Sequence, residues 1–182
     1  MNVQQFLSNI SAVGLSRSNR FRIIFTPPGN LNRDVISLAS LFVESAEIPG
    51  RAMQTTDFRI YGPSFKNPVL STYNDINFNL LCDRDLSQKQ IFDAWLDLIN
   101  PINTFDFNYR EEYTSSVKIQ QVADDGSISY SCELIEAFPT AVGALATNWA
   151  EDNFHRVQIT MSYRFWQFVP VTGAEATPGF VT

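Results

Sequence analysis

The chain of 182 residues is long enough for one domain with its own hydrophobic core. Its formal net charge of −6 argues against a protein that grips nucleic acid through the phosphates, because such binding needs clustered Lys and Arg. Aromatic residues make up 13% of the chain and charged residues only 18%, which fits a large internal core and a surface buried against partners equally well.

No segment is predicted to carry the chain into or across a membrane. The first residues lack the basic start and clean apolar run of a signal peptide, and no stretch approaches the ~20 apolar residues of a membrane span. Cys82 and Cys132 predict reduced thiols without a disulfide framework. We therefore expect a protein made in the cytoplasm, with no membrane anchor.

The N-terminal part contains one clear strand pattern. Residues 1–16 weakly favour a short helix, whereas residues 19–25 alternate in polarity as a strand does, until two prolines end the pattern. Residues 34–48 fit either a helix or a strand.

Residues 51–74 predict an extended strand or hairpin arm that carries a long loop, because Pro and Gly interrupt an alternating pattern. Long loops in compact domains are usually functional or mobile. We hypothesise that the wider segment from about Glu44 to Tyr73 is an assembly arm, with an ordinary surface hairpin as the alternative. The candidate arm residues are Glu44, Ile48, Pro49, Gly50, Arg51, Tyr61, Gly62 and Pro63.

The middle of the chain predicts a strand followed by the one clear helix. Residues 75–83 alternate as a strand, and Ser87 with Gln90 predicts a capping box at the start of an amphipathic helix. The pair Asn100-Pro101 ends that helix, since proline disfavours helix in the preceding residue. Residues 104–110 alternate Phe and Tyr with polar residues and predict another strand.

The C-terminal part predicts a β-hairpin and a final strand. Asp125-Gly126 separates two alternating runs, as in a hairpin turn. Residues 154–166, "FHRVQITMSYRFW", alternate strictly, so one parity should face the core. Residues 1–168 are expected to form one domain, with a C-terminal tail at 169–182 that is flexible or ordered on assembly. The predicted core anchors are Trp95, Phe107, Trp149, Tyr163 and Trp166.

The sequence offers no recognisable catalytic or metal site. His155 is the one histidine, and its parity with Val157 and Ile159 favours a packed side chain over a general base. One histidine and two distant cysteines supply no metal-ligand spacing, and no phosphate-binding glycine pattern is present. We expect no enzymatic activity and no cofactor.

Five stretches taken in order resemble the tail tube proteins of contractile-tailed bacteriophages, over roughly residues 17–168. They are "NRFRIIF", "ESAEIPGR", "DINFNLLCDRDLSQKQIFDAWLDLINP", "FDFNYREEY" and "LIEAFPTAVGALATNWAEDNFHRVQITMSYRFW". The resemblance implies a β-rich α+β fold in which two packed antiparallel sheets form a barrel-like sandwich with one flanking helix.

The same resemblance implies a structural virion protein. Hexameric rings would stack into the inner tail tube, which conducts DNA during ejection. Its implied partners are further copies of the chain, the tail sheath outside, baseplate proteins that initiate the tube, and the tape-measure protein and DNA inside. Two alternatives stay open: a baseplate or tail-terminus relative of the same fold, and a β-sandwich hydrolase or ligand-binding domain.

Overall fold

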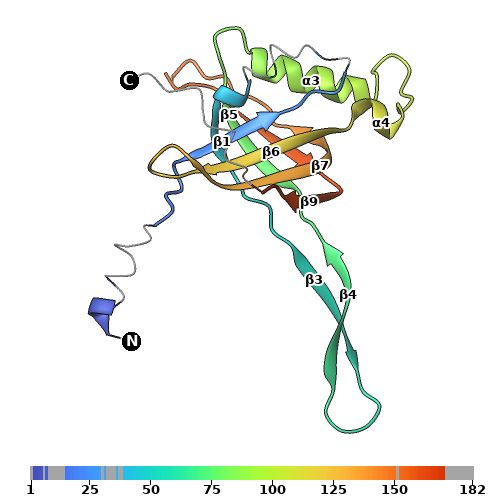
Figure 1. Cartoon of the computed structure of the whole chain (residues 1–182). Coiled ribbons are helices and arrows are strands. Elements are labelled where there is room, and N and C mark those ends of the chain that lie inside the picture. The colour runs from blue at the N-terminus through green and yellow to red at the C-terminus, as the bar shows by residue number, and fades with distance from the viewer. Residues whose placement is uncertain are drawn as a thin grey trace.

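A computed structural model describes residues 2–5, 7, 15–29, 31, 36, 39–150 and 152–170. In this part the chain forms two packed antiparallel sheets, a helix across one end of them, and a hairpin that stands away from the body (Figure 1). The predicted β-rich fold with one flanking helix is confirmed, although these sheets do not close into a barrel. The predicted N-terminal helix and the tail at 169–182 lie largely outside the described residues.

The two sheets share one long strand. The first sheet runs in the order β1 (Phe21–Phe25), β6 (Ser115–Val122), β7 (Ile128–Val142) and β9 (Phe165–Phe168). The second runs in the order β7, β8 (Arg156–Ser162), β5 (Ile76–Leu81) and β2 (Val43–Ala46). The predicted hairpin at Asp125-Gly126 connects β6 to β7, and Gly126 has the positive φ of 83° that such turns need.

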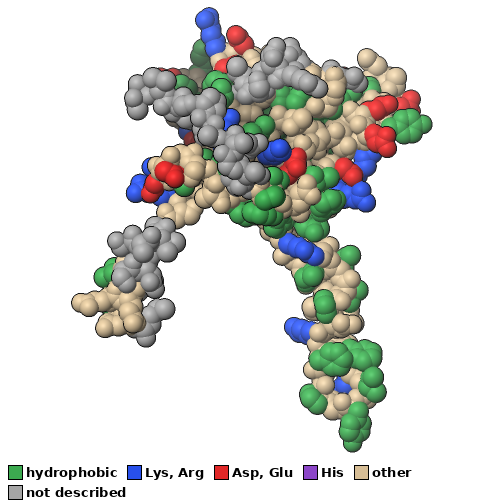
Figure 2. All heavy atoms as spheres, viewed as in Figure 1, with side chains coloured by type: hydrophobic (Ala, Val, Ile, Leu, Met, Phe, Trp, Pro, Cys, Tyr) green, Lys and Arg blue, Asp and Glu red, His purple; other side chains and the backbone are tan. Residues whose placement is uncertain are grey.

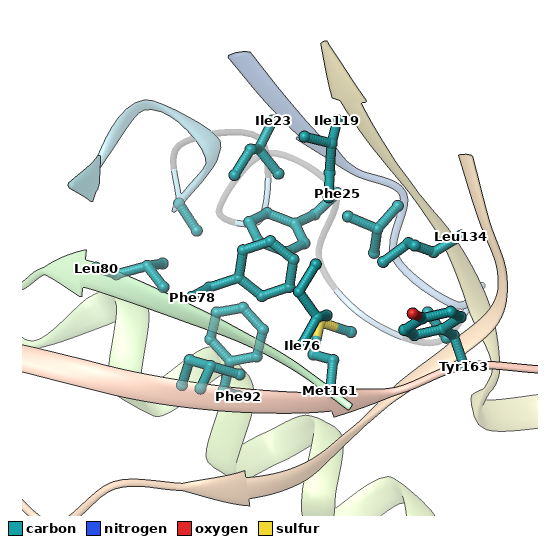
Figure 3. Packing of buried hydrophobic residues seen from close by; sticks show 14 of the residues in the cluster. Ile23, Phe25, Ile76, Phe78, Leu80, Phe92, Ile119, Leu134, Met161 and Tyr163 are labelled. Carbon is teal, nitrogen blue, oxygen red and sulfur yellow. The ribbon is translucent and has the colours of Figure 1, made fainter. Parts of the chain in front are cut away.

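The core lies between the sheets and the helix. In β8 the parity of Val157, Ile159 and Met161 is fully buried, as the alternation predicts. Figure 3 shows the centre of this packing, where Phe25 from β1 meets Phe78 and Phe92 edge to face, with ring centroids 5.5 and 5.6 Å apart. Such edge-to-face pairs add stability beyond burial alone.

The helix α3 (Ser87–Ile99) has the predicted extent but a different cap. The residue before it, Leu86, has left-handed backbone angles, and the Asp83 carboxylate accepts a 2.8 Å hydrogen bond from the Ser87 amide. In return the Asp83 amide donates to the Gln88 side chain at 2.9 Å. The predicted capping box of Ser87 and Gln90 is therefore wrong, because the charged Asp83 side chain satisfies the helix start instead.

The chain passes between the two sheets twice at one corner, within β7 and again between β8 and β9. Glu136 in β7 has a φ of 53°, and the pairing of β6 with β7 shifts its register beside it. The predicted final strand is also two strands, because β8 ends at Ser162 and β9 joins the other sheet. At the corner the Glu136 carboxylate binds Arg110 at 2.7 Å and Arg164 at 2.8 Å. The pair with Arg164 joins β7 to the link between β8 and β9, and the pair with Arg110 joins β7 to the start of α4.

The predicted strand at 104–110 is wrong. This stretch is a loop that leads into the short helix α4 (Arg110–Tyr113). Its polar groups bond to the end of α3 rather than to another strand: the Asn108 amide donates to the Ile99 carbonyl, and its side chain donates to the Leu98 carbonyl at 2.7 Å. The segment at 34–48, left open between helix and strand, contains both, with helical residues at 36 and 39–41 before β2.

Candidate assembly surfaces

The hairpin of β3 (Ala52–Phe58) and β4 (Phe65–Thr72) is the most unusual feature of the described chain. The two strands form a separate sheet and pair with each other. Every residue of β3 is exposed, and Figure 1 shows the hairpin projecting from the body as a long arm. An isolated two-stranded hairpin is marginally stable in water, so this one is suited to gain stability from another chain.

The tip of the hairpin is apolar. Phe58 and Phe65 face each other across the last strand pair, with ring centroids 5.4 Å apart, and both remain about half exposed. Beyond them Ile60 is 82% and Tyr61 98% exposed. Figure 2 shows these hydrophobic side chains gathered at the far end of the arm. Exposed apolar clusters of this kind mark interaction surfaces.

The base of the hairpin is attached to the body. Pro49 is buried, and the Trp166 indole N–H donates a 3.1 Å hydrogen bond to the Gly50 carbonyl. Arg51 donates to the Ser71 hydroxyl on the opposite strand at 3.0 Å. The arm therefore leaves the body from a fixed point at β9.

The predicted arm residues fall into three groups. Ile48, Pro49, Gly50 and Arg51 lie at the base, and Tyr61, Gly62 and Pro63 form the tip. Glu44 does not belong to the arm, because it lies in β2 at the edge of the second sheet and pairs with Arg156 at 2.7 Å. The segment begins its departure from the body after the base residues, not at Glu44.

A second exposed apolar surface lies beside the C-terminal half of α3. A groove of about 700 Å³ is formed between that helix, the loop that follows it, and β7 at Phe138–Thr140. We call it the α3 groove. Its apolar lining comes from Leu96, Ile99, Ile102, Phe105, Phe107, Phe138 and Pro139, and its acidic residues are Asp93 and Asp97.

The loop at 101–109 holds its aromatic side chains outward. The Phe105 amide donates to the Pro101 carbonyl at 2.9 Å, and the Ile102 amide donates to the Asp97 carboxylate at 3.1 Å. Phe105 has a φ of 57°, a left-handed conformation that costs a non-glycine residue about 1–3 kcal/mol. Phe105 and Phe107 are nonetheless 72% and 76% exposed. A strained loop that exposes two phenylalanines is poorly explained by the fold of one chain alone.

Some of the predicted core anchors are buried and others are exposed. Trp95 and Tyr163 are buried, and Trp166 packs against the core while partly exposed. Phe107 and Trp149 are not core anchors. Phe107 is turned outward by the loop beside α3, and Trp149 lies fully exposed in a turn that the Asn148 side chain stabilises by accepting from the Ala150 amide.

The corner residue Glu136 pairs with two arginines, Arg110 and Arg164. The hydrogen bonds from Arg164 and Arg110 hold its pKa below the ordinary value. Arg110 also lies over the Phe138 ring, 5.7 Å from its centre, beside the α3 groove. One of the two arginines thus contacts both Glu136 and a residue of the groove lining.

His155 lies just before β8, half-buried, and its carbonyl accepts a 2.9 Å hydrogen bond from the Cys82 amide. His155 lines a shallow depression together with residues 144–148, 153, 154 and 156. None of these lining residues is an Asp, Glu or Cys that could act with it as an acid–base pair. No group of three or more His, Cys, Asp or Glu suited to a metal ion occurs within the described residues. Likewise, no described helix is long and apolar enough to cross a membrane.

The α3 groove was not predicted from the sequence. The one available signal was the alternation of phenylalanines at 105 and 107, which we interpreted as a strand with an inward face. Since Pro101 precedes the loop and Asn108 bonds back to the helix, that alternation marks an outward apolar face instead.

A known protein family and several solved structures resemble the chain. A family described as phage tail tube protein matches residues 16–169. A chain of an extracellular contractile injection system, from the PVC sheath-tube complex in the extended state, superposes with a TM-score of 0.64 at 17% identity, covering 89% of this chain and 97% of that one. A chain of the anti-feeding prophage tube-terminating cap gives 0.64 at 16% identity, with 86% and 92% covered.

A chain of the anti-feeding prophage baseplate gives a TM-score of 0.64 at 12% identity, with 85% of this chain and 95% of that one covered. Identities this low show a shared fold alone. No curated protein sequence matches the chain.

Proposed function

Because the chain belongs to the phage tail tube protein family, we propose that six copies form a ring and that rings stack into the inner tube of a contractile tail. Membership of this family makes the chain a tail tube-like structural protein. The six-fold ring, the stack and the DNA conduit are the proposal. It gives the protein a mechanical role and no catalytic one.

The observation that carries the proposal is the projecting hairpin. A two-stranded arm with an apolar tip has no packing partner within the described part of its own chain. Burying its exposed Phe58, Ile60, Tyr61 and Phe65 against another copy would give the hydrophobic gain that an isolated arm lacks. We therefore assign the arm from Ala52 to Thr72 a role in assembly, with its base at Ile48–Arg51 fixed to the body.

The charge of the chain suits a conduit for DNA. A tube must let its cargo slide, and acidic walls repel phosphates and give no counterion release. Six copies at −6 each would give a ring of −36. Low affinity for DNA is thus expected of the assembled tube.

The proposal fixes the partners and the location. The tube would contact a tail sheath outside, baseplate proteins at the end where it starts, and the tape-measure protein and DNA inside. The protein would be part of the virion after synthesis in the host cytoplasm. The structurally similar injection-system chain comes from a sheath-tube complex, which is consistent with a sheath partner.

A second candidate is a protein that ends the tube rather than filling its length. The cap and baseplate chains superpose with the same TM-score of 0.64 as the chain from the sheath-tube complex. Fold similarity therefore does not separate the two roles. A tube-body subunit polymerises with itself, whereas a cap stops at one ring.

The experiment is assembly of the purified chain, followed by negative-stain electron microscopy. The test variant is Ile60→Ser with Tyr61→Ser, which leaves the body untouched because both side chains are almost fully exposed. We expect tubes from the original chain and a large loss of tubes from the variant, at unchanged melting temperature. Single rings would favour the tube-end role, and equal tube formation by the variant would contradict the role of the arm.

A further inference from the structure

We propose that the α3 groove of one copy receives the hairpin tip of the copy in the next ring. This inference rests on the proposed function and names the surface that the arm binds. The partner is a second copy of this chain. Three independent features of the two surfaces support the pairing: apolar character, charge, and position at opposite ends of the molecule.

The first feature is matched apolar surface. The tip presents Phe58, Ile60, Tyr61 and Phe65, and the groove presents Ile102, Phe105 and Phe107, all exposed in the single chain. Convex aromatic anchors that enter a concave apolar site are the usual centre of a stable interface. Contact between the two surfaces would cover both exposed clusters at once.

The second feature is opposite charge. Residues 51–74 contain Arg51, Arg59 and Lys66 against the single acid Asp57, so the hairpin is +2 in a chain of −6. The groove carries Asp93 and Asp97, although Lys89 pairs with Asp93. A basic arm is therefore attracted to an acidic surface such as this groove on another copy and is repelled by the basic arms of other copies.

An unpartnered acceptor lies in the groove lining. The Asn100 side-chain oxygen is buried and has no hydrogen-bond partner among the described residues. Buried polar atoms are nearly always paired, so this one calls for a donor. The hairpin carries two candidate donors near its tip, the Arg59 guanidinium and the Tyr61 hydroxyl.

The third feature is the position of the two surfaces. Figure 1 shows α3 across one end of the body and the hairpin leaving from the opposite end. Two different complementary surfaces make a heterologous, head-to-tail contact, and because they lie at opposite ends of the molecule, this contact adds copies along one axis rather than around a closed ring. The pairing therefore generates growth along one axis, as stacking of rings requires.

The first test separates the groove from the rest of its loop. The variant Phe105→Ser with Phe107→Ser removes two exposed groove residues, and Tyr109→Ser is the matched control. Tyr109 is an exposed aromatic on the same loop and parity that does not line the groove. We expect the double variant to raise the concentration needed for tubes at least about tenfold, a change of ~1.4 kcal/mol in contact free energy. The control should assemble like the original chain.

The second test detects the contact directly by disulfide cross-linking. Tyr61→Cys combined with Ile102→Cys should form disulfides between copies when assembled tubes are oxidised, giving a ladder on a non-reducing gel. Tyr61→Cys with Trp149→Cys is the control, because Trp149 is exposed but lies outside the groove. Native Cys132 is buried and Cys82 half-buried, so their background is measured in the unaltered chain.

The outcomes distinguish this inference from the proposed function. A ladder with position 102 but not 149, together with a defect in the groove variant alone, supports the pairing. Tubes that form without the 61–102 ladder, or a groove variant that matches its Tyr109 control, overturn the pairing and leave the tube role standing. Failure of the original chain to assemble under any condition contradicts both.

Discussion

Trp95 offers the most quantitative test of the core. Its side chain is completely buried in α3, its ring stacks on Phe92 at a centroid distance of 6.1 Å, and its indole N–H donates to the Tyr113 carbonyl at 2.7 Å. The residue thus joins α3 to α4 and fills the space under the helix. We expect Trp95→Ala to destabilise the folded chain strongly, because it leaves a cavity and removes the donor from a partly buried carbonyl.

The magnitude follows from those contacts. Truncation of a buried tryptophan costs about 3–5 kcal/mol, which includes the cavity. For a domain of this size, 1 kcal/mol shifts the melting temperature by about 2–4 °C, so the expected drop is about 6–20 °C. Trp95→Phe keeps most of the apolar volume and loses the partly buried hydrogen bond to Tyr113, which alone is expected to cost about 0.5–1.5 kcal/mol.

The assay is urea unfolding and calorimetry of the three monomeric proteins under conditions that do not permit assembly. The account requires the order original chain, Trp95→Phe, Trp95→Ala from most to least stable. If Trp95→Ala left the free energy of unfolding unchanged but abolished assembly, Trp95 would be an interface residue and the reasoning would be refuted.

Three further outcomes are expected. Glu136→Gln should lower the melting temperature at pH 7, and the difference should vanish in acid. Arg164 and Arg110 lower the pKa of Glu136, so its stabilisation is present above the ordinary pKa and is lost as the pH falls through the folded-state pKa. A constant difference in melting temperature at all pH values would argue against the ion pairs. Gly126→Ala should cost about 1–2 kcal/mol in urea unfolding, since φ is 83° there, and no loss would contradict that turn geometry. The unaltered protein should contain no stoichiometric zinc by metal analysis, and His155→Gln should leave tubes intact. Turnover of glycan, ester, peptide or phosphodiester substrates that disappears in this variant would overturn the structural role.

Local patterns were sufficient where one segment decides its own structure. The helix at Ser87–Ile99 and the turn at Gly126 follow from spacing and from residues with strong conformational preferences. The buried parity of β8 follows from strict alternation. In each case the residues that give the signal are the residues that make the contacts.

Elsewhere tertiary contacts decided the outcome. The alternation of residues 154–166 continues across the break at Tyr163-Arg164, so a change of sheet leaves no trace in polarity. Alternation at 105–109 identified an apolar face correctly but not its direction, which the bonds of Asn108 to α3 determine. Polarity patterns tell which side chains avoid water, not whether the same chain or another one covers them.

The central claim is that the chain polymerises through its projecting hairpin, and cryo-electron microscopy of the concentrated, purified protein tests it most directly. The account predicts hollow tubes of stacked rings, with density for the Ala52–Thr72 hairpin reaching from each ring onto the next. Monodisperse monomers at every concentration, salt and pH, or tubes in which the hairpins contact no neighbouring ring, would contradict it.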